Sequence, residues 1–261
     1  MDPGLSFRPK RSDGGMHFQA AARPIATVSS PDDLNEATLY LNEKGGDRVI
    51  ELPSYAQFRI KPNPDSTTRE VLCIAGASGG GKSWIARGYA ADYHATYPKR
   101  PVFVFSALTK DATLDTLTFL KRLDIKSFVD EPVEDGEELK GFKKSLVIFD
   151  DCEALDGAEK KAVDAILKSL LTLGRHSVTS VIVCNHLPTR GKDTRLLLNE
   201  STLFVVFPQA MGYHTLQYLC EQHVGLSKKE ISELRHVRSR WVALSKSFPR
   251  YMIASNEAHI L

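Results

Sequence analysis

The sequence predicts an α/β protein with a mostly parallel central sheet and helices on both of its faces. From residue 69 onward, short apolar runs of the kind found in buried strands alternate with longer helix-forming stretches. Alternation of this kind is typical of a parallel sheet whose faces are covered by crossover helices. A glycine-rich turn lies between one of these strands and the next helix. At 261 residues, the chain is long enough to bury such a sheet in one core.

The individual elements follow from this alternation. The strands expected up to residue 207 are 71–75, 102–105, 146–149, 178–184 and 203–207, and the helices are 82–97, 112–123, 157–173 and 189–199. Further along, helical patterns at about 213–222 and 227–236 precede strand-like runs at 240–244 and 251–254. Because helices alternate with these short apolar runs, the sheet is expected to be covered on both faces.

The N-terminal region looks different from the rest of the chain. Residues 1–45 are expected to form a flexible arm, because prolines and paired glycines interrupt periodic patterns there. A short helix, capped by an aspartate, is expected within it over residues 32–46. Residues 46–261 are expected to form a single domain that begins with one or two strands and ends, over 209–261, with a helical and strand extension.

Composition excludes several classes of protein. Charged residues make up 25% of the chain, hydrophobic residues make up 42%, and the formal net charge is only +2, which argues against a histone-like DNA wrapper. No apolar stretch approaches the roughly 20 residues of a membrane helix, and the N-terminus lacks the apolar core of a signal peptide. The cysteines are scattered without a C-x-x-C pair, so neither a zinc site nor a disulfide framework is expected.

The glycine-rich turn has the chemistry of a phosphate-binding loop. Residues 76–83 read GASGGGKS, which matches the G-x-x-x-x-G-K-S pattern of a P-loop. Glycines let backbone amides approach phosphate oxygens, and the following helix directs its N-terminal dipole at the anion. Lys82 is expected to contact the β- and γ-phosphates, and the Ser83 hydroxyl to bind Mg²⁺. The expected nucleotide-binding residues are Gly76, Ala77, Ser78, Gly79, Gly80, Gly81, Lys82, Ser83 and Trp84.

A second motif supplies carboxylates. Residues 144–151 read KSLVIFDD, an apolar strand that ends in two acids and matches a Walker B motif. Asp150 is expected to hold Mg²⁺ together with Ser83. Asp151 is the expected base that polarises the attacking water; many P-loop ATPases have glutamate at that position, and Glu153 is the alternative base. The two motifs together predict ATP and Mg²⁺ as cofactors and ATP hydrolysis as the reaction.

The order of the motifs favours the motor class of P-loop ATPases (the ASCE type). The strand at 102–105 lies between the P-loop helix and the Walker B strand in sequence, and we expect it to separate the two motif strands in the sheet. Nucleotide kinases and GTPases usually keep those strands adjacent. In motor ATPases a polar residue at the tip of the strand after Walker B contacts the γ-phosphate, and Asn185 fits that role. For His186, a structural role or contact with DNA is expected.

Three segments together resemble a known family. They are GASGGGKS, LVIFDD, and a third region that contains Gly174-Arg175-His176, an apolar strand over 180–184, Asn185 and the stretch 195–199. These segments are similar to the packaging ATPases of large double-stranded DNA viruses, the poxvirus-type members of the FtsK–HerA superfamily. The resemblance covers about residues 68–210, and the Gly-Arg-His segment is its most specific part. The family usually has glutamine where Asn185 stands.

This resemblance implies a motor that packages viral double-stranded DNA into a preformed capsid. It implies a homo-oligomeric ring, a pentamer or a hexamer, with ATP between neighbouring subunits and with capsid or vertex proteins as further partners. It also implies that an arginine of one subunit completes the catalytic site of the next; Arg175 is the first candidate, and Arg190 and Arg195 are the others. The expected location is the host-cell cytoplasm at virus assembly sites, with association with the virion.

Basic residues in the C-terminal part are candidates for contacts with DNA phosphates. They are Lys228, Lys229, Arg235, His236, Arg238 and Arg240, with a second basic turn at Arg190 and Lys192. On a helix, Arg235 and Arg238 would share a face. A solvated helix face, with an ordinary i,i+4 pair between Lys229 and Glu233, is the competing interpretation.

Three other functions remain open from the sequence. A helicase or a segregation pump would use the same motor core. A nucleotide kinase would need adjacent motif strands and an arginine-rich lid, and the strand at 102–105 counts against it. A non-hydrolysing, nucleotide-gated scaffold would require Asp151, Glu153 and Asn185 to point away from the γ-phosphate.

Overall fold

The computed structural model describes residues 2–8, 22–30, 33–133, 139–186 and 192–261. The chain divides into two compact units. Unit 2 is the continuous segment Asp65–Val206, and unit 1 combines the two ends of the chain, Met1–Pro64 and Phe207–Leu261. The boundary expected after residue 45 therefore falls inside unit 1, and the expected single domain over 46–261 is shared between the two units.

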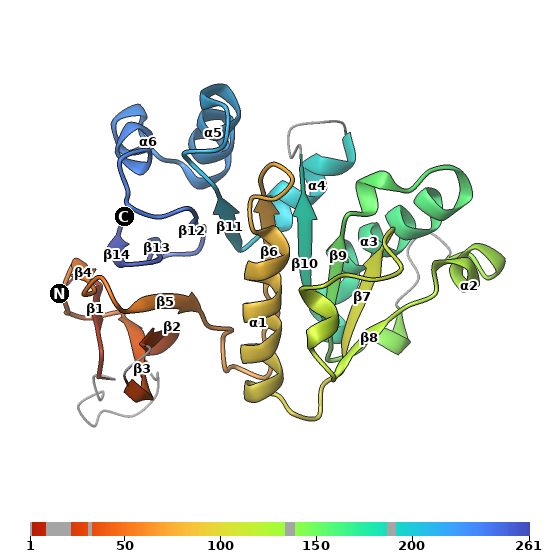
Figure 1. Ribbon diagram of the computed structural model, residues 1–261, viewed down its shortest axis with the longest axis horizontal. Helices are drawn as coiled ribbons and strands as arrows, with labels where there is room; N and C mark the ends of the chain where they lie inside the picture. The colour runs from red at the N-terminus through yellow and green to blue at the C-terminus, as the bar shows by residue number, and fades with distance from the viewer. Residues whose placement is uncertain (1, 9–21, 31–32, 134–138, 187–191) are drawn as a thin grey trace. The chain divides into compact units, whose positions relative to one another are not determined.

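Unit 2 is built on parallel strands in the order β11-β6-β10-β9-β7-β8 (Figure 1). Their bounds are β6 Val71–Ala75, β7 Val102–Ser106, β8 Leu120–Arg122, β9 Leu146–Asp150, β10 Ser180–Asn185 and β11 Leu203–Val206. Every residue of β6, β9, β10 and β11 is buried, which explains why these strands are apolar runs without polar alternation. The predicted parallel α/β core is confirmed.

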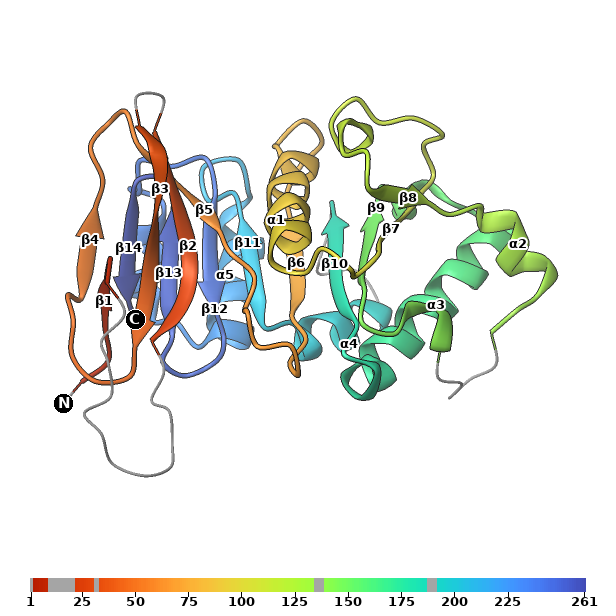
Figure 2. The same ribbon diagram turned by 90° about the horizontal axis from the view of Figure 1, so that it is seen from below.

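Helices cover both faces of this sheet (Figures 1 and 2). Helix α1 (Lys82–Thr96) lies on one face, and α3 (Gly157–Ser177) and α4 (Lys192–Glu200) lie on the other. α3 buries apolar residues at three- and four-residue spacings, the pattern of a helix that packs along one stripe. A short helix, α2 (Ile125–Asp130), and three 3₁₀ turns, η1 (Leu114–Thr116), η2 (Lys140–Phe142) and η3 (Cys152–Ala154), complete the unit.

The helix expected over 112–123 is wrong, because that segment forms η1 and β8. Asp111 Oδ1 accepts hydrogen bonds from the backbone amides of Thr113 and Leu114 at 2.7 and 2.6 Å. A local side-chain contact of this kind gives the backbone an alternative to a helical first turn. The segment then extends and pairs with β7, with Leu120 opposite Val102.

The separation of the two motif strands is confirmed, but the strand that separates them is not the one expected. β10 lies between β6, which leads into the P-loop, and β9, which carries the Walker B acids. β7, the strand expected between them, pairs with the far side of β9. Position in sequence between two strands does not fix position between them in a sheet, since β10 returns to the centre through the long helix α3.

Unit 1 contains antiparallel strands and two short helices. One sheet has the order β1-β3-β2-β5, and the other strands of the unit pair in the order β4-β14-β13-β12. The bounds are β1 Gly4–Ser6, β2 Arg23–Ser30, β3 Asp33–Asn42, β4 Val49–Glu51, β5 Gln57–Ile60, β12 Val242–Ser245, β13 Tyr251–Ala254 and β14 Glu257–Ile260. The helices are α5 (Tyr213–Leu219), which continues into a π-helical turn (Cys220–Val224), and α6 (Lys228–Leu234).

The helix expected over residues 32–46 is wrong, since β3 occupies residues 33–42. Leu39 and Leu41 are buried, while Thr38 and Tyr40 are half-buried, so the segment has the two-residue period of a strand. β3 pairs along most of its length with β2. Three strands, β1, β2 and β3, thus lie in the range for which we expected an arm. Among the described residues, no helix is long and apolar enough to cross a membrane.

Candidate active site

The glycine-rich turn forms at the carboxyl end of β6, directly before α1. Gly79 and Gly81 have positive φ angles, 70° and 107°, in the region that favours glycine. A side chain at Gly80 would place its Cβ 3.0 Å from the carbonyl oxygen of Ala77, so the turn is tight there as well. Gly81 is the N-cap of α1, and the helix dipole therefore points at the turn. These features are those of a phosphate-binding loop.

Lys82 lies inside this turn. Its side chain is buried, and Nζ donates hydrogen bonds to the carbonyl oxygens of Gly76 at 3.0 Å and Ala77 at 3.1 Å. Nζ is also 3.4 Å from Nδ1 of His186. An ammonium group buried among neutral acceptors is an attractive centre for an anion, because phosphate oxygens are stronger acceptors than carbonyl oxygens.

Ser83 and Asp150 meet where the two motifs face each other. Ser83 Oγ donates a 2.9 Å hydrogen bond to Oδ2 of Asp150, the last residue of β9. Asp150 is almost completely buried, and its Oδ1 has no hydrogen-bond partner among the described residues. Hydroxyl and carboxylate oxygens are ligands that Mg²⁺ accepts, and an orphaned buried carboxylate oxygen fits a missing cation. This hydrogen bond joins the P-loop to the tip of the Walker B strand.

Burial raises the pKa of Asp150, because a buried carboxylate loses its hydration. The interaction with the Cys184 thiol and the hydrogen bond from Ser83 lower this pKa, and the neighbouring Asp151 carboxylate adds to the rise. Within the described part of the chain, no cluster of three or more His, Cys, Asp or Glu side chains could hold a metal by itself. A Mg²⁺ ion here would therefore need phosphate oxygens as additional ligands, which is usual for nucleotide-bound Mg²⁺.

Three polar residues surround the tip of β9. Asp151 adopts a left-handed conformation, with φ 52° and ψ 22°, which is uncommon for a residue other than glycine. Its Oδ1 is 3.1 Å from Nε2 of His186. Glu153 Oε2 accepts a 2.9 Å hydrogen bond from the backbone amide of His186. Both candidate bases therefore lie next to the Walker B aspartate, and each contacts His186.

Asn185 is the last residue of β10 and is largely buried at the same edge of the sheet. Its carbonyl oxygen accepts a 3.1 Å hydrogen bond from the amide of Gly76, so the tip of β10 is tied to the start of the P-loop. Trp84, in the first turn of α1, has 52% of its surface exposed. His186 is the site residue that sequence reasoning undervalued. Its position one residue after a strand tip between the two motifs was the available signal.

Comparison with known proteins places the chain. No protein-family model matches it. The uncharacterized protein V3 of Sputnik virophage is 32% identical to it over 251 residues, which cover 94% of this chain and 98% of V3. This chain belongs to the V3 family.

Solved structures give more distant likenesses to this V3-family protein. The cytoplasmic domain of the type VII secretion ATPase EccC from Thermomonospora curvata matches with a TM-score of 0.50 at 13% identity, over 80% of this chain and 28% of that chain. The genome-packaging NTPase B204 of Sulfolobus turreted icosahedral virus 2, in complex with ATPγS, matches with a TM-score of 0.47 at 11% identity, over 77% of this chain and 100% of that chain. The likeness to EccC shows the fold, which is that of a P-loop ATPase.

Arg175 of this V3-family protein does not lie at the P-loop of its own chain. It is exposed near the C-terminal end of α3, just before β10 begins. The P-loop lies at the carboxyl edge of the parallel sheet, whereas Arg175 lies at the amino edge. Arg190 is outside the described residues, and Arg195 is exposed on α4. Arg175 could thus contact only a nucleotide that is bound to another subunit.

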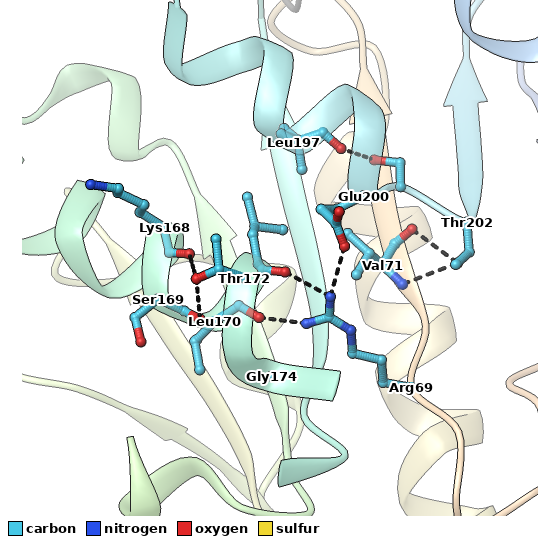
Figure 3. Close-up of polar contacts among 12 residues, drawn as sticks. Arg69, Val71, Lys168, Ser169, Leu170, Thr172, Gly174, Leu197, Glu200 and Thr202 are labelled. Carbon is cyan, nitrogen blue, oxygen red and sulfur yellow. Dashed lines mark hydrogen bonds and ion pairs between the residues drawn. The ribbon is translucent and has the colours of Figure 1, made fainter. Parts of the chain in front are cut away.

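A buried arginine at the amino edge explains the glycine of the Gly-Arg-His segment (Figure 3). The guanidinium of Arg69 donates to the carbonyl oxygens of Leu170 and Leu171 in α3 and pairs with Glu200 at the end of α4, at 3.0 Å. A Cβ at Gly174 would be 2.7 Å from Nη1 of Arg69. Burial lowers the pKa of Arg69. Glycine at 174 therefore leaves room for the guanidinium in this position, a role that the sequence alone did not reveal.

The basic residues of the C-terminal part are exposed but do not form the expected helical face. α6 ends at Leu234, so Arg235 is its C-cap and Arg238 lies in the following turn. The expectation that Arg235 and Arg238 share a helix face is therefore wrong. Lys229 and Glu233 form the ordinary i,i+4 pair, at 3.8 Å, with both side chains mostly exposed. The second basic turn lies mostly outside the described residues, because Arg190 is not among them.

Proposed function

We propose that this protein is an ATP-hydrolysing motor that moves double-stranded DNA into a viral capsid. The observation that supports hydrolysis is the hydrogen bond from the P-loop residue Ser83 to Asp150, with two further carboxylates, Asp151 and Glu153, that both contact His186 beside Lys82. A loop that only binds phosphate needs no second carboxylate; hydrolysis needs one to orient or activate water. The P-loop ATPase fold agrees with this reading.

Each residue has a physical role in the proposed reaction. The backbone amides of the P-loop and the N-terminus of α1 bind the triphosphate, with Lys82 at the β- and γ-phosphates. Ser83 and Asp150 would hold Mg²⁺, which neutralises charge on the phosphate oxygens when bound. Asp151 would accept the proton of the attacking water, with Glu153 as the alternative base, and the amide of Asn185, at the tip of β10, would orient that water.

The motor role is supported by the relative and by the motifs. Protein V3 comes from a virophage, and the Gly-Arg-His segment resembles the packaging ATPases of large DNA viruses. In a ring of five or six subunits, Arg175 of one subunit would complete the ATP site of the next, with capsid or vertex proteins as partners. Exposed basic residues in unit 1, such as Arg235, Arg238 and Arg240, would contact DNA phosphates. Virus assembly sites in the host cytoplasm, and the virion itself, are the proposed locations.

The decisive experiment measures ATP turnover by the purified protein with and without duplex DNA, together with the mass of the oligomer. Turnover that DNA stimulates, in a particle of five or six subunits, is the expected result. A triplex-displacement assay on the same sample then tests translocation. Lys82→Ala should abolish turnover, because it removes the cation that binds the phosphates. Lys99→Ala, which changes an exposed lysine, is the matched control.

Other results would select other functions. Turnover independent of DNA would contradict the proposed motor function, and transfer of phosphate to a nucleoside monophosphate would indicate a kinase. Tight ATP binding without turnover would indicate a nucleotide-gated scaffold. Translocation without any defect in genome content after depletion from virus-producing cells would favour a helicase or a segregation pump over packaging.

The proposed role of Arg175 requires a test between subunits. Arg175→Ala subunits mixed with wild-type subunits should suppress turnover more than in proportion to their share, because each poisons the site of a neighbour. A rate that stays constant per wild-type subunit would exclude Arg175. Arg195→Ala provides the matched comparison, since it removes another exposed arginine of the same unit.

A further inference from the structure

His186 connects the P-loop to the Walker B acids through three separate contacts. Nδ1 lies 3.4 Å from Lys82 Nζ, Nε2 lies 3.1 Å from Asp151 Oδ1, and the backbone amide donates to Glu153 Oε2 at 2.9 Å. The ring is about 31% exposed and the Asp151 side chain about 30%, so both can reach a ligand at this edge.

The two ring contacts fix where the proton of the neutral imidazole lies. An ammonium group has only donors, so Nδ1 must accept from Lys82. The Asp151 carboxylate has only acceptors, so Nε2 must carry the hydrogen and donate it. The contacts thus have one direction, from Lys82 through the ring of His186 to Asp151. The opposite tautomer would set an N–H against an ammonium and a lone pair against a carboxylate.

Lys82 has three hydrogens, and three acceptors surround it: the carbonyl oxygens of Gly76 and Ala77 and Nδ1 of His186. A triphosphate that takes over Lys82 must replace some of these acceptors. Nδ1 is the longest of the three contacts, and the ring is the only one of the three acceptors carried by a side chain. Phosphate binding is therefore expected to release Nδ1 first, while Nε2 keeps its bond to Asp151.

We propose that His186 is a positioning residue that orients the Asp151 carboxylate for proton transfer and links that orientation to the contact of Lys82 with the phosphates. This inference rests on the proposed ATPase function. The bond from Nε2 occupies Oδ1 of Asp151 and leaves Oδ2 to face the water. It also holds a side chain whose backbone is in an uncommon left-handed conformation, which its surroundings must compensate.

The proposal also accounts for aspartate at a position where glutamate is common. Aspartate is one methylene shorter, so its carboxylate stands further from the phosphates and has fewer ways to reach water. A hydrogen bond from a ring on the adjacent strand tip restricts it to one orientation, which is the function of the third group in other base-activating arrangements. Glu153, which binds only the backbone of His186, would keep its contact if the ring were changed.

Two variants test the contact of Nδ1 with Lys82 and the contact of Nε2 with Asp151 separately. In His186→Gln, the amide nitrogen stands near the place of Nε2 and can still donate to Asp151. In His186→Asn, the amide is near the place of Nδ1 and can still accept from Lys82, but it does not reach Asp151. The expected result is that His186→Asn lowers kcat about tenfold or more with ATP affinity unchanged, and that His186→Gln retains kcat within about threefold.

Equal losses in the two variants, or no loss in either, would overturn the proposal. Thermal unfolding of both variants verifies that they fold, and His214→Asn, an exposed histidine of α5, is the matched control. Binding is measured separately with ATPγS, so a loss of affinity is not mistaken for a loss of kcat.

A second measurement does not depend on turnover. Nitrogen-15 NMR of the His186 ring in the full-length protein should show hydrogen on Nε2 and none on Nδ1 at neutral pH, and only the Nδ1 signal should shift strongly when ATPγS is added. Hydrogen on Nδ1, or a ring that does not respond to ATPγS that binds, would contradict the proposal. If wild-type protein shows the expected ring signals but never hydrolyses ATP, the ATPase function fails while the contact itself stands.

Discussion

The two edges of the parallel sheet in unit 2 both bury a charged group, but they treat it differently. At the amino edge, Arg69 is surrounded by acceptors: two helix carbonyl oxygens and Glu200. At the carboxyl edge, Asp150 accepts a hydrogen bond from Ser83 at Oδ2 and interacts with the Cys184 thiol, and its Oδ1 has no geometrically formed hydrogen bond among the described residues. A buried polar group normally has its partners, and each exception requires a reason.

This difference in hydrogen bonding indicates that the amino edge stabilises the fold and that the carboxyl edge is suited to bind a ligand. A satisfied charge at the ends of β6, α3 and α4 stabilises their packing (Figure 3). An unsatisfied charge at the tips of β6 and β9 costs stability until a cation and phosphates complete it. Substitutions at the two edges should therefore change stability in opposite directions, and only those at the carboxyl edge should change chemistry.

The largest effect is expected from Asp151→Asn. The variant should bind ATP as the wild type does and lose about 100-fold or more in turnover, because an amide cannot accept the proton of water. Binding of ATPγS and single-turnover hydrolysis measure the two steps separately. Asp156→Asn, an exposed aspartate at the start of α3, is the matched control. Normal turnover in Asp151→Asn would transfer the role of base to Glu153, and Glu153→Gln would then be the inactive variant.

Arg69→Met should destabilise the protein by about 2 kcal/mol, since it removes charge-assisted hydrogen bonds to two carbonyl oxygens and to Glu200 while keeping an apolar stem. Thermal unfolding should shift down by about 5 °C. Arg235→Met, which changes an exposed arginine, should shift it by far less. ATP affinity should remain near that of the wild type, and a specific loss of nucleotide binding would remove the distinction between the two edges.

Asp150→Asn should change stability in the direction opposite to Arg69→Met. It should stabilise the protein by about 1 kcal/mol at neutral pH, while it weakens Mg²⁺-dependent turnover. Burial raises the pKa of Asp150 above its ordinary value of 3.8. For a carboxyl group whose folded pKa is raised, stability is complete below the unfolded pKa and is lost as the pH rises through the folded pKa.

The advantage of Asp150→Asn should therefore disappear as the pH falls below the ordinary aspartate pKa of 3.8, because the wild-type carboxyl then becomes neutral in the unfolded state as well. Chemical denaturation at several pH values measures it. An advantage that stays constant with pH would mean that the charge of Asp150 is not its source.

The smallest effect is expected from Gly174→Ala. The new methyl group displaces the Arg69 guanidinium, while alanine favours the helix by about 1 kcal/mol relative to glycine, so the net loss should be below about 1 kcal/mol. In an Arg69→Ala background the same substitution should become stabilising. A double-mutant cycle measures this change of sign in the free energy of unfolding. The change would show that Gly174 serves to admit the Arg69 guanidinium, because it would not occur if glycine were needed for another reason.

Much of the core of unit 2 could be predicted from sequence. Local residue types predict the P-loop, the Walker B strand and helix α1, since phosphate chemistry requires glycine, lysine and acids in adjacent positions. β10 and Asn185 were found as well, through an apolar run that ends in polar residues. Asp111 illustrates a failure: its side chain caps a turn where helix propensity suggested a helix.

The remaining features depend on residues far apart in the chain. The contact of Gly174 with Arg69 joins positions more than a hundred residues apart, as do the contacts of His186 with Lys82. Strand β3 also escaped prediction, because its two-residue period is short and its partner β2 lies in a region rich in proline and glycine. Patterns in a single sequence report on neighbouring residues, and they contain no signal for contacts between residues far apart in the chain.

The composition of unit 1 from both ends of the chain has a consequence for synthesis on the ribosome. Amides of Leu52 and Phe58 donate to the carbonyl oxygens of Asn256 and Ser255, and the amide of Ile260 donates to Arg48. Residues 1–64 are synthesised before unit 2, whereas their partners in residues 207–261 are synthesised after it. All strands of unit 2 are therefore available first, so the nascent chain can complete unit 2 before unit 1.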